Sequence, residues 1–171
     1  MKFNNTENII KKADRVVSRC DSRDPQTIAG ELGIHVRMIP FKKQKGVYTV
    51  IERNRFIFIK EDLPENMKKI VLLHEIGHDQ LHRREALHFQ EFNLFDHQEN
   101  RLELEANLFA AQVSLPDEEI LELIRCGYPA EAIAAAMHSD VNLIALKTES
   151  LNRRGFDLHP PAYSDSFLKP R

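Results

Sequence analysis

The feature that most constrains this chain is a pair of histidines four residues apart, His74 and His78, with Glu75 directly after the first. On an α-helix, residues at this spacing lie one above the other on the same face, so both imidazoles can bind a single metal ion. The apolar residues around the pair repeat at helical spacing and share its face: Met67, Ile70, Val71 and Leu81. The pattern predicts a helix over residues 64–82 with a metal-binding pair on its buried side.

Glu75 lies about 100° around this helix from His74, at the edge of the same face. From there its carboxylate can hydrogen-bond a water molecule beside the ion without binding the ion itself, as a general base does. A structural zinc site is closed by four protein ligands, whereas a catalytic site has three protein ligands and one open position. Two histidines and a third ligand, with Glu75 beside them, therefore favour catalysis.

The sequence offers several candidates for the third ligand: His82, His88, His97, Glu103 and Glu105. His74 and His82 would lie about 12 Å apart along a straight helix, so they cannot bind the same ion. A hydrolytic site also gains from a hydrogen-bond donor that stabilises the oxyanion of the transition state. The sequence offers four candidates for this donor and does not select one: Tyr48, His82, His88 and His97.

The next predicted helix, over residues 99–114, carries both candidate glutamates. The residues that share the face of Glu103 are small: Ala106, Asn107 and Ala110. They would let this helix pack closely on the histidine helix and bring a carboxylate to the ion. Glu105 points to another side, among larger apolar residues. Helical geometry favours Glu103 only slightly, so both glutamates remain candidates.

Composition excludes several classes of protein. The chain has 171 residues, with 24 Lys and Arg against 26 Asp and Glu, for a net charge of −2. This balance gives no general attraction to nucleic acid or to an anionic membrane, and no apolar run could span a bilayer. Cys20 and Cys126 lie far apart and form neither a disulfide framework nor a zinc-binding pattern. Charges within the first residues argue against a secretion signal, so we expect a cytoplasmic protein.

The chain has a mixed first half and a helical second half. Residues 34–39, 46–51 and 55–59 are typical of strands, with residues 52–54 as a hairpin turn. Helical patterns cover residues 7–19, 25–32, 64–82, 99–114, 116–126, 129–137 and 141–151. We predict an α+β fold with a small, mostly antiparallel three-stranded sheet. The predicted domain covers residues 1–154, with a helical C-terminal part over 117–152, and residues 155–171 form an irregular tail.

Two segments resemble a known family. The segment HEIGHDQLH is followed by the pattern ExEANxFAAxxxLP, and together they resemble the ImmA/IrrE family of bacterial metallopeptidases. The segment DPQTIAGELGIHV resembles the family's opening helix and strand, so the resemblance extends over residues 7–152. It implies a zincin-like fold in which His74, His78 and Glu103 bind Zn²⁺. It also implies that Glu75 is the general base.

The resemblance further implies a substrate. Members of the family typically cleave a helix-turn-helix repressor, often one encoded on a phage or mobile element, and so derepress genes of lysogeny, transfer or stress response. We therefore expect a cytoplasmic, zinc-dependent endopeptidase whose partner is a repressor protein. No direct contact with nucleic acid or membrane is expected. Two imidazoles and a carboxylate also accept manganese or iron, so the ligand types leave the metal open.

The alternative is a DNA-binding protein, or a sensor or adaptor, with a structural metal site. Residues 129–151 have the rhythm of a helix-turn-helix, with a turn at residues 138–140. A DNA-reading helix presents Arg, Lys, Asn or Gln on its outer face. The last predicted helix offers Asn142 and Lys147 against Glu149, which favours a helical appendage that packs on the rest of the protein.

Overall fold

A computed structural model describes residues 3–83, 96–159 and 168 of the chain. This described part contains seven helices and three strands, in the order that the sequence predicts. The elements are α1 (Phe3–Cys20), α2 (Pro25–Glu31), β1 (Ile34–Ile39), β2 (Gly46–Ile51), β3 (Asn54–Lys60), α3 (Glu65–Leu81), α5 (Asp96–Ser114), α6 (Asp117–Arg125), α7 (Ala130–Ala136) and α8 (Val141–Arg153). The predicted α+β class is confirmed.

The strands β2 and β3 form the predicted hairpin. Ile51 pairs with Asn54, and the two residues between them, Glu52 and Arg53, have positive φ angles of 48° and 66°. Two-residue turns with positive φ at both positions match the right-handed twist of the strands that they join. The hairpin therefore follows from its short turn and from the β-branched and aromatic residues on either side.

The position of β1 corrects one detail of the predicted sheet. The strand order is β1-β3-β2, and β1 pairs with β3 in parallel, with Ile34 beside Arg55 and Ile39 beside Lys60. The sheet is therefore mixed, with one parallel and one antiparallel pairing, and is not mostly antiparallel. The reason is that residues 40–45 carry the chain past the place of β3, so β2 forms the far edge. The hairpin then returns β3 between the outer strands, in the direction of β1.

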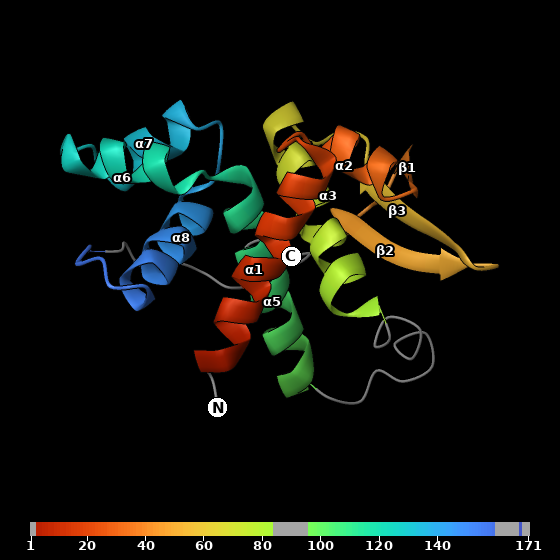
Figure 1. Ribbon diagram of the computed structural model, residues 1–171. Helices are drawn as coiled ribbons and strands as arrows, with labels where there is room; N and C mark the ends of the chain where they lie inside the picture. The colour runs from red at the N-terminus through yellow and green to blue at the C-terminus, as the bar shows by residue number, and fades with distance from the viewer. Residues whose placement is uncertain (1–2, 84–95, 160–167, 169–171) are drawn as a thin grey trace.

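Helices cover one face of the sheet. Successive side chains of a strand point to opposite faces, and Ile57 and Ile59 of β3 are fully buried. The helix α3 lies against β2 and β3, while α2 lies against β1, as Figure 1 shows. The sheet thus supports the helix that carries the two histidines.

The helices α3 and α5 pack against each other at the centre of the molecule (Figure 1). Gly77 permits this close approach, because a Cβ there would lie 3.1 Å from both the Cα atom and the carbonyl oxygen of Ala106. Ala106 and Asn107 are themselves fully buried. The close packing predicted from the small residues of the second helix is confirmed.

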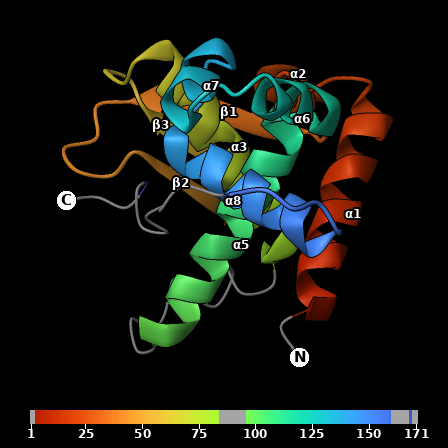
Figure 2. The same ribbon diagram turned by 90° about the vertical axis from the view of Figure 1, so that its left-hand side faces the viewer.

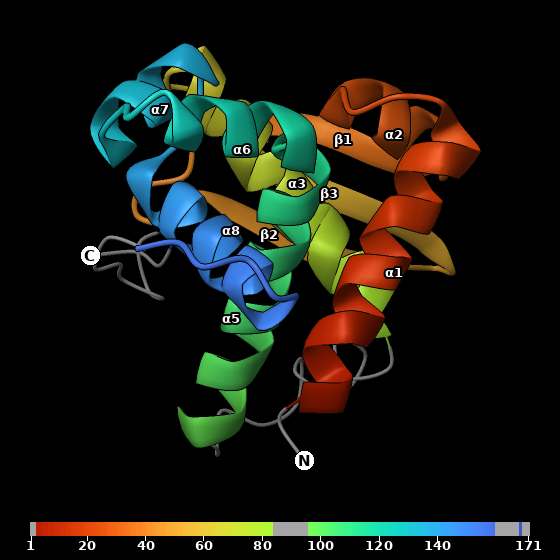
Figure 3. The same ribbon diagram turned by 60° about the vertical axis from the view of Figure 1, so that its left-hand side comes forward.

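The remaining helices extend this core. α1 packs on one side of α5 and α8 on another, as the turned views in Figures 2 and 3 show. Ile9 and Val16 of α1, and Leu143 and Ile144 of α8, are buried in one continuous hydrophobic core with the sheet and α3. This continuity is compatible with a single domain over residues 1–154, whose boundary stays a prediction.

The side chain of Lys147 on α8 is fully buried. Its Nζ atom donates to Oε1 of Gln112 on α5 at 2.6 Å and forms an ion pair with Asp117 at the start of α6. Arg154 binds the other carboxylate oxygen of Asp117 at 2.6 Å. Lys147, one of the two residues that could contact DNA bases under the DNA-binding alternative, is therefore buried and bonded within the protein.

Residues 155–159 form no helix or strand, and the rest of the predicted irregular tail, apart from the buried Leu168, lies outside the described residues. In the part of the chain that the structure describes, no helix combines the length and the apolar character that a membrane span needs.

Candidate metal centre

The two histidines of α3 and one glutamate of α5 direct their side chains at a common point. The Nε2 atoms of His74 and His78 lie 3.1 Å apart. The carboxylate of Glu103 meets both rings, with Oε2 3.4 Å from Nε2 of His74 and Oε1 3.3 Å from Nε2 of His78. Helical spacing aligns the histidines, and the close approach of α5 at Gly77 brings the carboxylate to them.

This arrangement fits a divalent metal ion. Two ligand atoms bound about 2.0–2.1 Å from one tetrahedral ion lie roughly 3.3–3.4 Å apart. The two Nε2 atoms lie 3.1 Å apart, and each lies 3.3–3.4 Å from a different oxygen of Glu103, which is close to that value. One ligand atom from each of the three residues can be chosen so that all three lie within 4.8 Å of one another. Two imidazoles and one carboxylate are also a donor set that zinc and several other divalent ions accept. Such a set leaves a fourth position open.

Each histidine is supported from behind by a second side chain. Nδ1 of His74 lies 2.8 Å from Oδ1 of Asn107, a buried residue of α5. Nδ1 of His78 lies 3.2 Å from Nδ1 of His82. With both Nδ1 atoms engaged, the Nε2 atoms of the two rings are the ones that face the cluster.

Glu75 is buried at the interface of α3 and β2, with 7% of its surface exposed. The backbone N–H of Tyr48 hydrogen-bonds its carboxylate. A Cβ on Gly46 would lie 2.8 Å from Oε1 of Glu75, so the glycine leaves the space that this carboxylate occupies. Burial raises the pKa of Glu75 to about 7, with His78 opposing and Glu103 reinforcing the shift. The group can therefore exchange a proton near neutral pH.

Glu103 differs from Glu75 in its electrostatics. Burial favours its protonated form, but hydrogen bonds with His74 and His78 outweigh that effect and hold the pKa of Glu103 well below its usual range. The carboxylate is thus ionised next to two imidazoles, which is the state that a metal ligand requires.

The structure separates the two glutamates that helical geometry left open. Glu103 faces His74 and His78, whereas Oε2 of Glu105 lies 2.8 Å from Nε2 of His82. His88 lies outside the described residues, and so does the side chain of His97. As ligands, His74, His78 and Glu103 stay a prediction, although the structure brings all three together.

His82 and Tyr48 are the two candidate oxyanion donors whose side chains the structure describes. Both ring nitrogens of His82 already have partners, in His78 and Glu105. Tyr48 is buried on β2, and burial together with the Asp79 carboxylate raises the pKa of its hydroxyl. Tyr48 therefore keeps its proton, as an oxyanion donor would have to.

Sequence reasoning missed two contributors to this site. Asn107 was placed on the inner face of its helix only as a small residue, yet its amide oxygen contacts His74. The signal was present, because Asn107 follows Glu103 by one helical turn. The role of Gly46 had no local signal, since it depends on how β2 packs against α3.

Below the cluster, Asp79 ties α3 to the sheet. Its buried carboxylate receives hydrogen bonds at 3.0 Å from Arg55 of β3 and from Arg83. Arg55 also donates to the carbonyl oxygen of Leu32. A buried carboxylate with two guanidinium partners is well compensated, so this contact anchors the end of α3 that carries His78.

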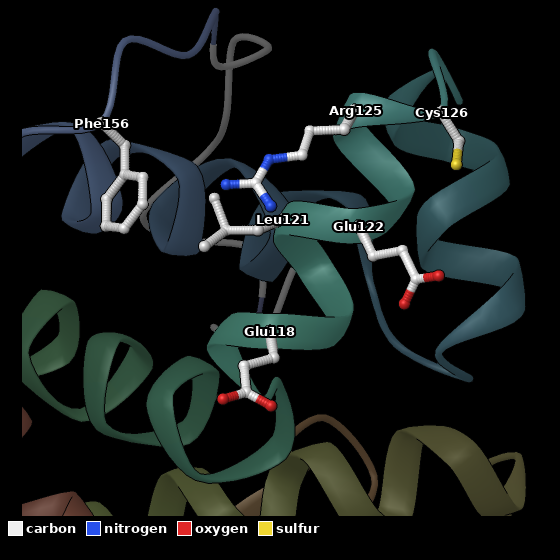
Figure 4. Close-up of a pocket in the computed structure, with 6 residues that line it drawn as sticks. All are labelled: Glu118, Leu121, Glu122, Arg125, Cys126 and Phe156. Carbon is white, nitrogen blue, oxygen red and sulfur yellow. The ribbon is translucent and has the colours of Figure 1, made fainter.

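A hollow of about 580 Å³ lies at the opposite, helical part of the molecule. It is formed by α6 and the segment after α8, and in Figure 4 the side chains of Leu121 and Arg125 reach toward Phe156. The residues that line it are Glu118, Leu121, Glu122, Arg125, Cys126 and Phe156. His74, Glu75, His78 and Glu103 are not among them.

The sequence matches known proteins over most of its length. Residues 29–156 match the family described as the IrrE N-terminal-like domain, peptidase family M78. The chain is 31% identical over 144 residues to a protein of Bacillus phage phi105 named "uncharacterized immunity region protein 2". That alignment covers 81% of this chain and 89% of the phage protein. The family match includes His74, Glu75, His78 and Glu103 and begins within α2, so α1 precedes it.

Proposed function

The chain belongs to the IrrE N-terminal-like domain family of M78 peptidases, and from this premise we propose that it is a zinc-dependent endopeptidase. The observation that carries the proposal is the convergence of three ligand side chains, His74, His78 and Glu103, whose ligand atoms lie within 4.8 Å of one another. A buried carboxyl with a pKa of about 7, Glu75, stands directly beside them. Three ligands, an open position and an adjacent base are the parts of a hydrolytic site.

Each residue has a defined part in the proposed reaction. His74, His78 and Glu103 would hold the ion. When bound, the ion supplies Lewis acidity, which polarises the peptide carbonyl and makes water more acidic. Glu75 takes a proton from the attacking water, and the same carboxyl then gives a proton to the amine that leaves when the C–N bond breaks.

We propose that the substrate is bound as an extended peptide along β2. This strand is an edge of the sheet, and its first residue, Gly46, touches Glu75. An edge strand has free backbone groups that can pair with an added strand, and these contacts hold a peptide regardless of its side chains. A peptide in that place would run next to the carboxylate that serves as base.

The proposed substrate is a helix-turn-helix repressor in the cytoplasm. The name of the phage phi105 relative places that protein in an immunity region, and repressor control is the property of such a region that a peptidase would alter. A peptidase of this kind would act on one protein at one or a few sites. Cleavage would separate the repressor's DNA-binding part from the rest and release the genes that it controls.

The test combines cleavage with metal analysis. The zinc-loaded protein is incubated with the helix-turn-helix repressor encoded beside it, and the products are identified by mass spectrometry. Wild type should cut at one or a few positions, and Glu75→Gln should be about 10³-fold slower while it keeps its zinc. A repressor that stays intact with fully zinc-loaded wild type would contradict the proposed substrate. A Glu75→Gln protein that cleaves at the wild-type rate would contradict the role of Glu75.

A further inference from the structure

A series of hydrogen bonds leads from His78 away from the metal centre. Nδ1 of His78 lies 3.2 Å from Nδ1 of His82, one helical turn further along α3. Nε2 of His82 lies 2.8 Å from Oε2 of Glu105 on α5. His82 has only 4% of its surface exposed, so water does not compete for these contacts.

The contacts define where the ring hydrogens lie. When His78 presents the lone pair of Nε2 to an ion, the neutral ring carries its hydrogen on Nδ1 and donates it to His82. Nδ1 of His82 must then accept, so its own hydrogen lies on Nε2 and is donated to the Glu105 carboxylate. Both rings have a single tautomer in this arrangement, and the series ends on a charged acceptor.

Glu105 is itself held from two other directions. The side-chain amide of Asn5, on α1, donates to its Oε1 atom. Nε of Arg101 lies 3.6 Å from the same oxygen. The carboxylate is 13% exposed and lies where α1, α3 and α5 meet. It is therefore a fixed point against which the His82 ring can be oriented.

The other histidine of the pair has a shorter support. His74 contacts Asn107 directly, at 2.8 Å. A metal-bound histidine usually donates its second ring N–H to a carboxylate, carbonyl or water, and removal of that partner typically weakens metal binding about 10–100-fold. His78 is linked to the carboxylate of Glu105 through the imidazole of His82. His82 and Glu105 together therefore give His78 the support that Asn107 alone gives His74.

We propose that His82 and Glu105 are positioning residues of the metal centre. Glu105 orients the ring of His82, and His82 holds His78 with its Nε2 atom directed at the ion. The inference rests on the part of the proposed function in which His74, His78 and Glu103 bind a divalent ion. It gives Glu105 a role that acts through His82, in place of direct binding to the ion.

Two substitutions of His82 separate the two halves of the series. The amide of asparagine lies near the place of Nδ1 in histidine, whereas the longer glutamine reaches the place of Nε2. His82→Asn therefore keeps an acceptor for His78 and loses the contact with Glu105. His82→Gln keeps the contact with Glu105 and loses the acceptor for His78. Each variant loses one hydrogen bond of the same series, so the pair is matched.

The measurement is the zinc dissociation constant, obtained by competition with a chromophoric chelator. His82→Gln should bind zinc about 10–100-fold more weakly than wild type. His82→Asn should bind about tenfold more tightly than His82→Gln, although both should unfold at similar urea concentrations when zinc is removed. As a single substitution, Glu105→Leu should weaken zinc binding. In the His82→Asn background it should have little further effect, because the hydrogen bond between residue 82 and Glu105 is already absent there.

A second measurement needs no variant of His82. In long-range ¹H–¹⁵N spectra of zinc-loaded wild type, His78 should carry its hydrogen on Nδ1 and His82 on Nε2. A hydrogen on Nδ1 of His82, or equal zinc affinities for wild type and both His82 variants, would overturn the positioning role and leave the zinc site intact. A folded wild type that binds no zinc would overturn the proposed function and this inference together.

Discussion

Helix α5 contributes to two polar clusters, each built around buried side chains, which differ in how their charges are balanced. Near its C-terminal end, Gln112 joins Asp14 of α1 to Lys147 of α8, at 2.8 and 2.6 Å. Lys147 pairs in turn with Asp117, which also binds Arg154. This lysine cluster holds two cations and two carboxylates, so its charges compensate one another within the protein.

The second cluster, the histidine cluster of His74, His78, Glu103 and Glu75, is built differently. Its acidic groups are two carboxylates, and its other members are imidazoles whose Nε2 atoms meet the Glu103 oxygens at one point. When both rings present the lone pair of Nε2 to an ion, they are neutral and supply no positive charge of their own. A divalent cation at that point would both balance the carboxylates and accept the lone pairs.

The difference shows what marks a binding site among buried polar groups. Both clusters contain buried side chains and short contacts, so neither property separates them. What separates them is the direction of donors and acceptors: in the lysine cluster cations face carboxylates, and in the histidine cluster two imidazoles and a carboxylate converge on one point. The first arrangement should serve stability, and the second should serve binding and catalysis.

The largest effect should come from Glu103→Ala. Without its third donor, the histidine cluster should fall from about one zinc per chain to almost none, and cleavage should be lost with it. Elemental mass spectrometry of the purified protein measures the metal content. The metal-free variant should be less stable than the metal-free wild type, because the substitution removes the contacts of Glu103 with His74 and His78. If Glu103→Ala kept its zinc and Glu105→Ala lost it, the ligand would have to be reassigned.

The converse substitution, Asp117→Ala, should leave zinc binding intact and lower the free energy of unfolding by about 3 kcal/mol. Its loss would leave the buried ammonium of Lys147 with Gln112 as its remaining partner in the cluster. Urea unfolding in the presence of chelator measures this effect. The matched control is Glu119→Ala, an exposed acidic residue in the same first turn of α6, which should cost less than about 1 kcal/mol.

Equal costs for Asp117→Ala and Glu119→Ala would contradict the structural role of the lysine cluster. Loss of zinc from Asp117→Ala would show that the two clusters are coupled through α5.

The sequence was sufficient for the parts of the site that lie within one helix. The spacing of His74 and His78 predicted their common face, and the small residues after Glu103 predicted the close packing of its helix. The same spacing placed His82 too far along α3 to share an ion with His74. Helical periodicity acts over a few residues, so it reports such relations without knowledge of the fold.

Contacts between elements far apart in the chain could not be predicted from the sequence. The pairing of Lys147 with Asp117, and of His82 with Glu105, depends on how helices far apart in the chain are packed. The parallel pairing of β1 with β3 was also missed, because alternation of apolar residues identifies a strand and does not identify its neighbour. Lys147, which the sequence offers as a candidate for the outer face of a DNA-reading helix, is buried, although lysine is almost never fully buried unless it is paired.

A glycine substitution probes the border of the histidine cluster. In Gly46→Ala, the new Cβ would lie 2.5 Å from Cγ1 of Val71 and 2.8 Å from Oε1 of Glu75, so these side chains or the backbone of Gly46 must shift. We expect a loss of about 2 kcal/mol in the free energy of unfolding, together with slower cleavage because Glu75 is displaced. Chemical unfolding and a peptide-cleavage assay measure the two effects.

The control for this variant is Gly30→Ala in α2, where a Cβ would meet nothing within 4 Å. An alanine there should stabilise the helix by about 0.5–1 kcal/mol and leave cleavage unchanged. If Gly46→Ala were as active as wild type, Glu75 would not depend on its contact with β2.

The smallest effect concerns the pH dependence of the lysine cluster. Burial alone would raise the pKa of Asp117, but hydrogen bonds from Arg154 and Lys147 outweigh it and lower the pKa to about 2. In the unfolded chain the carboxyl takes up its proton at a higher pH, near its ordinary value of 3.8. The folded state is therefore favoured above about pH 4, and this contribution is lost as the pH falls towards 2.

The difference in unfolding free energy between wild type and Asp117→Asn should shrink over that interval, as measured by urea titrations at each pH. In the Arg154→Gln background, where one of the two cations is missing, the shrinkage should be smaller and should be complete at a higher pH, because the pKa of Asp117 in the folded state then lies closer to its ordinary value. A difference that stays constant down to pH 2 would mean that Asp117 has no ionic role in the lysine cluster, and the contrast between the two clusters would then rest on the histidine cluster alone.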